Sequence, residues 1–149
     1  MRCTREELEA AHDRYQARSE ACVRSGDWHP YGEQFTEDAV YVEHFMGTFE
    51  GRRAITDWIV ESMASTDPGW SFPLEWRMFD EDRGQVIFAA WNVLPDVDGN
   101  GPYRFISWSL VDYAGDDQWS RQEDLYDTGE MTRVYTAWNE AKATVDGAG

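Results

Sequence analysis

A phenol and a carboxylate stand two residues apart in the segment 35–55, FTEDAVYVEHFMGTFEGRRAI. The alternation from Ala39 onward predicts a strand, and side chains two apart in a strand point to the same face. Tyr41 and Glu43 therefore share one face, while His44 lies on the other. If the first face lines an apolar cavity, it carries a hydrogen-bond donor and a proton acceptor side by side.

A second place for chemistry is the acidic stretch 121–127, RQEDLYD. Its alternation places Gln122, Asp124 and Tyr126 on one face of a strand. Either face could be solvated, which is the usual fate of charged residues. A carboxylate held on the inward face loses hydration, which raises its pKa and suits a general base near neutral pH. Asp124 is therefore a candidate base, together with Glu43.

Two neighbouring segments with strand patterns supply candidates for the wall of such a cavity. Residues 85–94 place Asn92 on one face, and residues 103–113 place Trp108 on one face, but the sequence does not decide which faces point inward. For the aromatic candidates, a plain core position is the competing interpretation, because most buried aromatic residues simply pack. The candidate substrate-binding residues are Tyr15, Trp58, Trp108, Asn92, Tyr126 and His44.

No set of His, Cys and carboxylate residues has the spacing of a metal site. The segment Asp96-x-Asp98-x-Asn100-Gly101 matches the first half of an EF-hand loop, but Ser107 stands at the twelfth position, where a bidentate glutamate is needed. The flanking residues have strand patterns, so a hairpin loop is predicted instead. The glycine motifs of phosphate-binding and dinucleotide-binding loops are absent from the sequence. We therefore expect an activity that needs no metal and no cofactor.

The composition is that of a folded, acidic protein. Of 149 residues, 42% are hydrophobic and 15% aromatic, which argues against disorder and provides walls for a flat apolar ligand. The net charge of −16 would repel nucleic acid and anionic membranes, so neither is expected as a partner. No apolar run is long enough to span a membrane or to form a signal peptide. With Cys3 and Cys22 interpreted as reduced thiols, these features predict a cytoplasmic protein.

The remaining patterns describe the elements that would position the candidate residues. Thr4-x-x-Glu7 is a capping box that opens a long helix, and Gly26 ends it. Four β-rich runs with short connections predict an antiparallel meander of strands long enough to curve. The expected elements are a helix at 4–26, a short helical segment at 27–35, the strand that carries Tyr41, a helix at 52–65, strands at 71–80, 85–94, 103–113 and 118–126, and a last helix from 127.

This order predicts an α+β fold in which a cone-shaped, curved antiparallel sheet is wrapped around helices and encloses an apolar pocket. The chain length suits one domain, 1–149. Residues 1–3 and 144–149 are expected to be frayed. A curved sheet of this size leaves one apolar face to cover, so we also expect a homodimer.

The chain resembles the nuclear transport factor 2-like superfamily and, within it, the SnoaL-like polyketide cyclases, with ketosteroid isomerase and limonene epoxide hydrolase as relatives. The resemblance spans nearly the whole chain. It rests on Gly26-Asp27-Trp28 after the first helix, Phe35-Thr36-Glu37-Asp38-Ala39 before the first strand, Gly51-Arg52 before Ala54-Ile55, and the acidic last strand. These features indicate the fold rather than the reaction, because this fold carries many chemistries.

The resemblance also implies roles for single residues. The base aspartate of ketosteroid isomerases falls on Glu43, and the water-holding residues of limonene epoxide hydrolases fall on Tyr41, Glu43 and Asp124. SnoaL-like cyclases use an aspartate as acid and base, which the resemblance places at Asp124. The Arg-x-Asp pair of the hydrolases falls near Arg104 and Ile106, where the aspartate is missing, so epoxide opening loses that support.

Three functions are compatible with these observations. The first is an acid–base enzyme of the cyclase, isomerase or dehydratase type acting on a small, apolar, polyketide- or steroid-like molecule. In it, Asp124 or Glu43 removes a proton next to a carbonyl, and Tyr41 donates a hydrogen bond to the developing oxyanion. The second is epoxide hydrolysis, in which the same carboxylates activate water. The third is a ligand-binding or dimerisation module that catalyses no reaction.

Overall fold

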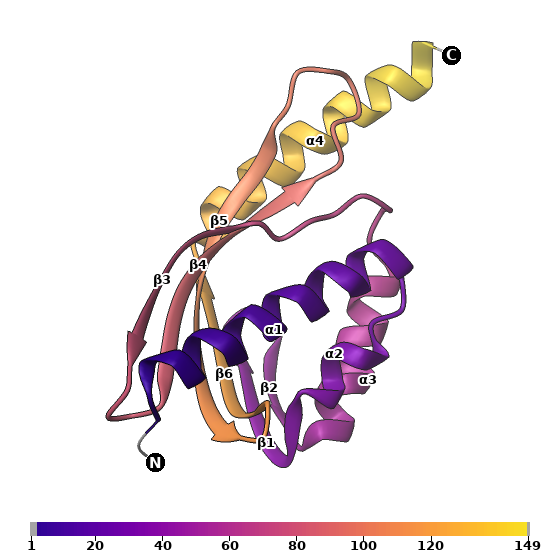
Figure 1. Cartoon of the computed structure of the whole chain (residues 1–149). Coiled ribbons are helices and arrows are strands. Elements are labelled where there is room, and N and C mark those ends of the chain that lie inside the picture. The colour runs from indigo at the N-terminus through magenta and orange to yellow at the C-terminus, as the bar shows by residue number, and fades with distance from the viewer. Residues whose placement is uncertain (1–2, 149) are drawn as a thin grey trace.

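The computed structural model describes residues 3–148. In this part of the chain, four helices and six strands follow one another as Figure 1 shows. The elements are α1 (Arg5–Ser25), α2 (His29–Glu33), β1 (Phe35–Glu43), β2 (Gly47–Glu50), α3 (Arg52–Ala64), β3 (Leu74–Asp80), β4 (Gln85–Leu94), β5 (Tyr103–Gly115), β6 (Gln118–Tyr126) and α4 (Thr128–Ala148). None of these helices combines the length and the apolar character that crossing a membrane requires.

The strands form one curved sheet in the order β2-β1-β6-β5-β4-β3. Neighbouring strands are antiparallel except β1 and β6, which run parallel and pair Tyr41 with Gln122 and Glu43 with Asp124. The predicted α+β class with a curved sheet is confirmed, and the sheet is mixed rather than purely antiparallel. The parallel pair brings the two sequence segments that hold the candidate carboxylates onto neighbouring strands.

The short strand β2 is an addition to the predicted elements. It forms a hairpin with β1 in which Phe49 lies opposite Tyr41. A strand of four residues is too short for its alternation to be distinguished from the pattern of a turn. After β2, Gly51 adopts φ 89° and its N–H donates to the Ala39 carbonyl at 2.7 Å, which fixes the start of α3 against β1.

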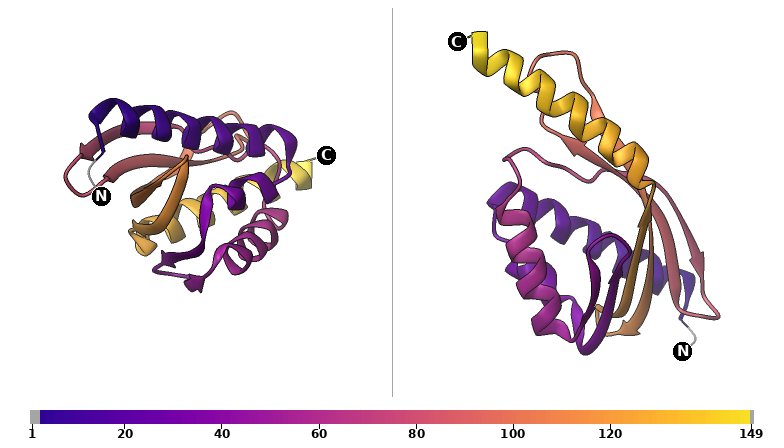
Figure 2. Two further views of the ribbon diagram at one scale, coloured as in Figure 1. Left: turned by 60° about the horizontal axis from the view of Figure 1, so that its bottom comes forward. Right: turned by 180° about the vertical axis from the view of Figure 1, so that it is seen from behind.

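The helices lie on the concave side of the sheet, with α1 running across it and α2 and α3 beside α1 (Figures 1 and 2). The predicted capping box opens α1, since Thr4 Oγ1 accepts the Glu7 N–H at 3.1 Å and the Glu7 carboxylate accepts the Thr4 N–H at 2.7 Å. Gly26 ends the helix with φ 76°, as predicted. The buried face of α1 consists of Leu8, Ala11, His12, Tyr15, Ser19 and Cys22.

Two groups of buried residues hold the elements together. The larger one joins the helices α1, α2 and α3 to the sheet and includes Leu8, Phe35, Ile55 and Trp119. The smaller one joins α4 to β4 and β5 and consists of Trp70, Leu94, Phe105 and Trp138. Members of both groups contribute to the walls of the cavity that forms the candidate site.

Within the described residues, parts of both stretches predicted to be frayed have defined structure. Cys3 is buried and its N–H donates to a carbonyl of the β3–β4 turn at 3.2 Å, so it is not frayed. The helix α4 continues past Thr144 to Ala148, and Thr144 Oγ1 donates to the Glu140 carbonyl at 2.9 Å. The rest of the predicted frayed ends, residues 1–2 and 149, lies outside the described residues.

The acidic loop between β4 and β5 is a hairpin loop, as predicted. Asp96 Oδ1 accepts the N–H groups of Gly99 at 2.9 Å and Gly101 at 3.2 Å, and Asp98 accepts the hydroxyl of Tyr103 at 2.9 Å. These carboxylates therefore shape the loop itself. Within residues 3–148, no group of three or more His, Cys, Asp or Glu residues could hold a metal ion.

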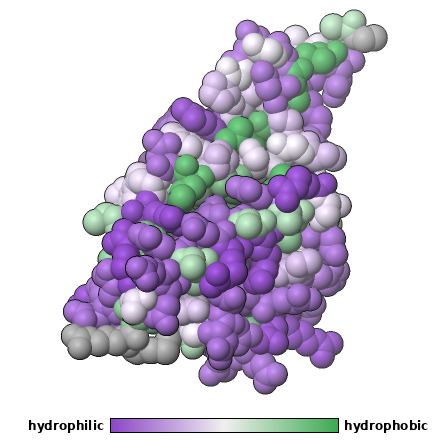
Figure 3. Space-filling model, in the orientation of Figure 1, coloured by the Kyte–Doolittle hydropathy of each residue, from purple (hydrophilic) through white to green (hydrophobic). Residues whose placement is uncertain are grey.

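Most of the molecular face shown in Figure 3 is hydrophilic, as the net charge of −16 leads one to expect. The apolar residues visible there gather toward the end of the molecule that carries α4. The outer face of the sheet holds several large exposed apolar side chains. They are Met78, Leu125, Trp108 and Ile87, with exposed fractions of 65%, 56%, 53% and 43%.

Candidate active site

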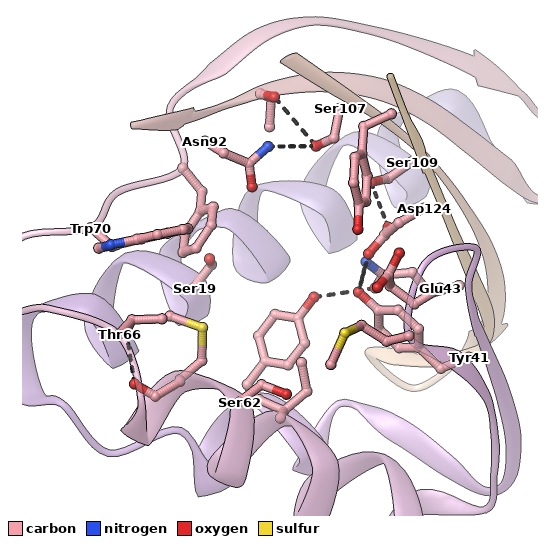
Figure 4. Close-up of a pocket in the computed structure, with 18 of the residues that line it drawn as sticks. Ser19, Tyr41, Glu43, Ser62, Thr66, Trp70, Asn92, Ser107, Ser109 and Asp124 are labelled. Atoms are coloured by element: carbon pink, nitrogen blue, oxygen red, sulfur yellow. Dashed lines mark hydrogen bonds between the residues drawn. The ribbon is translucent and has the colours of Figure 1, made fainter. Parts of the chain in front are cut away.

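A cavity of about 430 Å³ lies between the concave face of the sheet and the helices α1, α3 and α4. A volume of this size suits a small molecule. The walls are mostly aromatic and aliphatic, and many of the polar side chains come from β1, β5 and β6 (Figure 4). These polar residues are Tyr41, Glu43, Ser107, Ser109, Gln122, Asp124 and Tyr126.

Asp124 of β6 lies at the centre of this polar side. Its Oδ1 accepts hydrogen bonds from Ser109 Oγ at 2.7 Å and from Gln122 Nε2 at 3.0 Å, and its Oδ2 accepts the hydroxyl of Tyr41. The sheet register causes this convergence, because Asp124 lies directly opposite Ser109 on β5 and one strand away from β1. Three donors point at one carboxylate, an arrangement that stabilises its ionised form.

Gln122 fixes the direction of the hydrogen bonds around Tyr41. Its Oε1 lies 2.9 Å from the Tyr15 hydroxyl and 3.2 Å from the Tyr31 hydroxyl, and these two hydroxyls are 2.6 Å apart, so one phenol donates to the other and the second donates to Oε1. With its oxygen used as the acceptor, Gln122 donates through Nε2 to the Tyr41 oxygen at 2.8 Å. Because the Tyr41 oxygen accepts from Gln122, its single hydrogen is available for Asp124. The result is a series of hydrogen bonds that begins at two buried phenols and ends at the Asp124 carboxylate.

Glu43 is the second carboxylate of the cavity, and only 5% of its surface is exposed. Its Oε1 accepts the N–H of Phe45 at 3.0 Å, where the chain turns from β1 toward β2. The phenol of Tyr126 lies beside it and is hydrogen-bonded to its carboxylate. Since Glu43 and Asp124 are paired positions on neighbouring strands, two carboxylates face the same cavity.

These surroundings shift the pKa of both Asp124 and Tyr41. Burial raises the pKa of Asp124 above its ordinary value; the hydrogen bonds from Tyr41, Gln122 and Ser109 lower it in part, and the charge of Glu43 raises it further. Burial, followed by the charge of Asp124, raises the pKa of Tyr41 well above its usual range. Asp124 is therefore a stronger base than an aspartate in water, and Tyr41 remains a neutral hydrogen-bond donor.

Tyr41, Glu43 and Asp124, the three predicted catalytic residues, all line the cavity. Four of the predicted substrate-binding residues line it as well. The ring of Trp58 packs edge-on against the Tyr41 ring, with centroids 4.9 Å apart, and thereby supports its position. These four residues are Tyr15, Trp58, Asn92 and Tyr126.

Trp108 and His44 lie outside the cavity, so their prediction as substrate-binding residues is wrong. Trp108 is on the outer face of β5, where it packs edge-on against Trp76 with centroids 5.3 Å apart. His44 is exposed, and its Nε2 lies 2.8 Å from Glu123 Oε1. Both positions follow from the two-residue period of a strand, because the neighbouring residues, such as Ser109 on β5, occupy the inward face.

The sequence patterns do not single out Gln122, Ser109 and Tyr31, which complete the hydrogen-bond network. The alternation of the last strand identifies Gln122 once Asp124 is placed inside. The contact of Ser109 depends on the register between β5 and β6, which shifts at irregularities close to the connecting turn. Tyr31 belongs to the five-residue helix α2, and no sequence pattern marks it as a site residue.

Comparisons with known proteins agree with this architecture. Residues 16–121 match the family model of the SnoaL-like domain. An NTF2-like protein from Anabaena variabilis is 15% identical over 85% of this chain and 94% of that chain, with a TM-score of 0.66. A LEH-like epoxide hydrolase from M. tuberculosis is 15% identical over 87% of this chain and 89% of that chain, with a TM-score of 0.64.

A protein with a cystatin-like fold from Methylobium petroleophilum is 13% identical over 85% of this chain and 79% of that chain, with a TM-score of 0.62. Comparison with curated protein sequences gave no match. The structural similarities show the shared fold, and the fold does not determine the reaction. The matched family model spans more than half of the chain. The chain therefore belongs to the SnoaL-like domain family.

Proposed function

We propose that this protein is an acid–base enzyme of the isomerase, cyclase or dehydratase type, which moves a proton next to a carbonyl in a small, largely apolar molecule. The observation that carries the proposal is the position of Asp124. It is a carboxylate with a raised pKa on the wall of an apolar cavity, and it is held by three donors from three neighbouring positions of the sheet. A general base at this place needs that combination of fixed position and increased basicity.

The hydrogen-bond count supports a role for Oδ2 of Asp124 in the proton transfer. A carboxylate oxygen has two lone pairs, and Oδ1 uses both for Ser109 and Gln122. Among the described residues, Oδ2 accepts only from Tyr41 and so keeps one lone pair for a substrate proton. When that proton leaves carbon, the C–H bond breaks, an O–H bond forms on Asp124, and the electron pair moves onto the carbonyl oxygen as an enolate.

Tyr41 is the donor that would stabilise this enolate. Once Asp124 is protonated, its Oδ2 no longer attracts the phenol hydrogen as strongly, and the hydroxyl of Tyr41 can rotate toward the substrate oxygen. Its raised pKa keeps the phenol neutral, so it stabilises the oxyanion by a hydrogen bond rather than by giving up its proton. Asp124 then returns its proton to another atom of the substrate, which leaves the enzyme unchanged.

The apolar walls of the cavity would hold the substrate and exclude water from the enolate. Aromatic rings line much of the cavity: Trp28 and Phe72 have centroids 5.9 Å apart, and Trp70 and Phe72 have centroids 6.3 Å apart. Such rings accept a flat apolar body and strengthen the electrostatic interactions at the polar side.

Deuterium exchange into a simple ketone tests this proposal and does not require the natural substrate. We would incubate 2-tetralone, a flat enolisable ketone, with the protein in D₂O and follow its α-protons by NMR, with binding checked by saturation transfer. We expect exchange above the buffer rate, in proportion to the protein concentration. A bound ketone that exchanges only at the buffer rate would contradict the proposal and favour a ligand-binding module.

Epoxide opening has weaker support from the side chains. The positions that the resemblance assigns to the acid pair of limonene epoxide hydrolases hold Arg104 and Ile106, and neither of them lines the cavity. The Arg104 guanidinium instead lies 3.9 Å from the centroid of the Trp91 ring. Similarity to the hydrolase from M. tuberculosis concerns the fold alone.

We further propose that two copies associate through the outer face of the sheet. Its exposed apolar residues form two cross-strand pairs, Met78 with Ile87 and Trp108 with Leu125. The ring of Trp76, two residues before Met78 on β3, packs against Trp108 and links the two pairs. A patch of this kind is unusual on a monomer that has a net charge of −16. Covering it with the same patch of a second copy gives a closed, symmetric dimer.

A charge placed in this patch should separate the dimer. We expect sedimentation velocity to give twice the mass of one chain for the unmodified protein at tens of micromolar, and the mass of a single chain for Trp108→Asp. Val145→Asp is the matched control, because Val145 is an exposed apolar residue on α4, away from the sheet. A monomeric unmodified protein, or a dimeric Trp108→Asp variant, would contradict the proposed association.

A further inference from the structure

The cavity has an unbalanced charge. Glu43 and Asp124 both line it, and none of its lining side chains in the described part of the chain belongs to Lys, Arg or His. The sheet register makes the two carboxylates neighbours on parallel strands, about 5 Å apart along the hydrogen-bonding direction of the backbone. Two negative groups therefore share one largely apolar space.

Neutral groups supply the hydrogen bonds to these carboxylates. Asp124 accepts from two hydroxyls and one amide, and Glu43 accepts from the N–H of Phe45 and interacts with the phenol of Tyr126. The basic side chains nearest in sequence, His44 and Arg121, instead pair with Glu123 on the outer face. Burial of a carboxylate without a counter-ion costs free energy. The site therefore lacks a positively charged group.

The surroundings of Glu43 suit a cation that also has apolar surface. The rings of Phe105, Tyr126 and Tyr135 line the same part of the cavity, with Phe105 5.8 Å from Tyr126 and 6.2 Å from Tyr135 between centroids. Aromatic faces attract ammonium groups, and the attraction grows when water is excluded. Glu43 has a carboxylate oxygen, Oε2, that the Phe45 N–H does not use.

We infer that the cavity selects a ligand with a flat apolar body and one protonated nitrogen, for which Glu43 is the counter-ion. The inference rests on the proposed function, because it takes the cavity to be the substrate site and leaves Asp124 free as the base. An ammonium beside Glu43 would neutralise its carboxylate, while the apolar body of the ligand contacts the aromatic walls. A carboxylate or phosphate on the ligand would instead meet two like charges.

The field of the whole protein acts in the same direction. A net charge of −16 raises the local concentration of cations and lowers that of anions. The cavity lining also includes Phe45 and Met46, which are 59% and 54% exposed and lie next to Glu43 in the sequence. An amine with an apolar body would therefore meet apolar surface and negative charge together.

Three probes with the same flat body test the inference by isothermal titration calorimetry at pH 7.5. They are 2-(aminomethyl)naphthalene, which is cationic, 2-(hydroxymethyl)naphthalene, which is neutral, and 2-naphthoate, which is anionic. We expect the cation to bind at least about tenfold more tightly than the alcohol, and the naphthoate to bind most weakly. Equal or weaker binding of the cation, or no binding of it at millimolar concentration, would overturn the inference.

Two variants separate the effect of Glu43 from the general field of the protein. Glu43→Gln keeps an oxygen for the Phe45 N–H and removes the charge, so it should lower the affinity for the cation about tenfold and that for the alcohol less than about twofold. Glu20→Gln removes one charge from the exposed side of α1 and should change neither. Equal losses of cation affinity in both variants would show a general field effect and overturn the role of Glu43.

These experiments measure binding selectivity, so the inference can fail while the proposed reaction still stands. If the alcohol binds as well as the amine while 2-tetralone still exchanges its protons, the acid–base function stands and the charge selectivity is wrong. If Glu43→Gln is less stable than the unmodified protein, the probe series on the unmodified protein still decides the inference.

Discussion

Replacing Asp124 with asparagine is expected to lower the rate of α-proton exchange of 2-tetralone by about 10²–10⁴-fold, the usual contribution of a general base. The amide has nearly the same shape as the carboxylate and can still accept from Ser109 and Gln122 through its oxygen. It has no basic lone pair at the position of Oδ2. The loss should therefore appear in the rate constant rather than in the affinity for the ketone.

Two further measurements make this result specific. The thermal midpoint of the Asp124→Asn variant should equal or exceed that of the unmodified protein, because the substitution removes a carboxylate whose pKa burial raises. Asp57→Asn is the matched control, since it makes the same chemical change on the exposed side of α3. An Asp124→Asn variant that exchanges protons at the normal rate would remove Asp124 from the mechanism.

The second large effect concerns stability at acidic pH and depends on His12. This histidine of α1 has no exposed surface and packs between rings, with its centroid 5.4 Å from Tyr15 and 4.6 Å from Phe88. Its Nδ1 accepts from Arg77 at 3.3 Å, and its Nε2 has no hydrogen-bond partner among residues 3–148. Burial first, and then the charge of Arg77, lower the pKa of His12 to about 4, although the charge of Asp13 opposes them.

A depressed histidine pKa makes the folded state less stable in acid. In the unfolded chain His12 takes up a proton near pH 6.5, while in the folded chain it stays neutral down to about pH 4. The unfolded state therefore binds more protons between these values, and stability that is fully present above pH 6.5 is lost as the pH falls toward 4. The total loss is about 3 kcal/mol in the free energy of unfolding.

His12→Leu should remove this part of the acid sensitivity. We expect urea unfolding at pH 7 and pH 4.5 to show a smaller loss of free energy in the variant than in the unmodified protein, by about 2 kcal/mol. The difference between the two proteins isolates His12 from all other titrating groups. Arg77 still has its ion pair with Asp13, at 2.6 Å, in the variant. Equal losses in both proteins would show that His12 titrates normally in the folded state.

The sequence supports prediction of the fold better than prediction of the site. The capping box at Thr4, the ending of α1 at Gly26 and the meander of four strands are local patterns, and the structure confirms each of them. The parallel pairing of β1 with β6 is a long-range feature, and the hairpin of β1 with β2 involves a very short strand. No local periodicity specifies such features, so they could not be predicted.

For the site, strand alternation identified which residues share a face but not which face points inward. On β1 and β6 the carboxylates themselves suggested the inward face, and Tyr41, Glu43 and Asp124 do line one cavity. On β5 the large ring of Trp108 suggested the wrong face, because serines, which suit solvent equally well, fill the inward positions beside Asp124. Burial of small polar residues depends on the hydrogen bonds they find, and those require the register.

The most direct test of this account is a carbon-13 NMR titration of the Asp124 carboxyl group in the unmodified protein and in Glu43→Gln. The account predicts a pKa above the ordinary value of an aspartate, and a lower pKa in Glu43→Gln, because the variant removes the charge that raises it. The rate of proton exchange should then fall as the pH falls through the same value. An Asp124 carboxyl that titrates at or below the ordinary value, unaffected by Glu43→Gln, would contradict its assignment as the base.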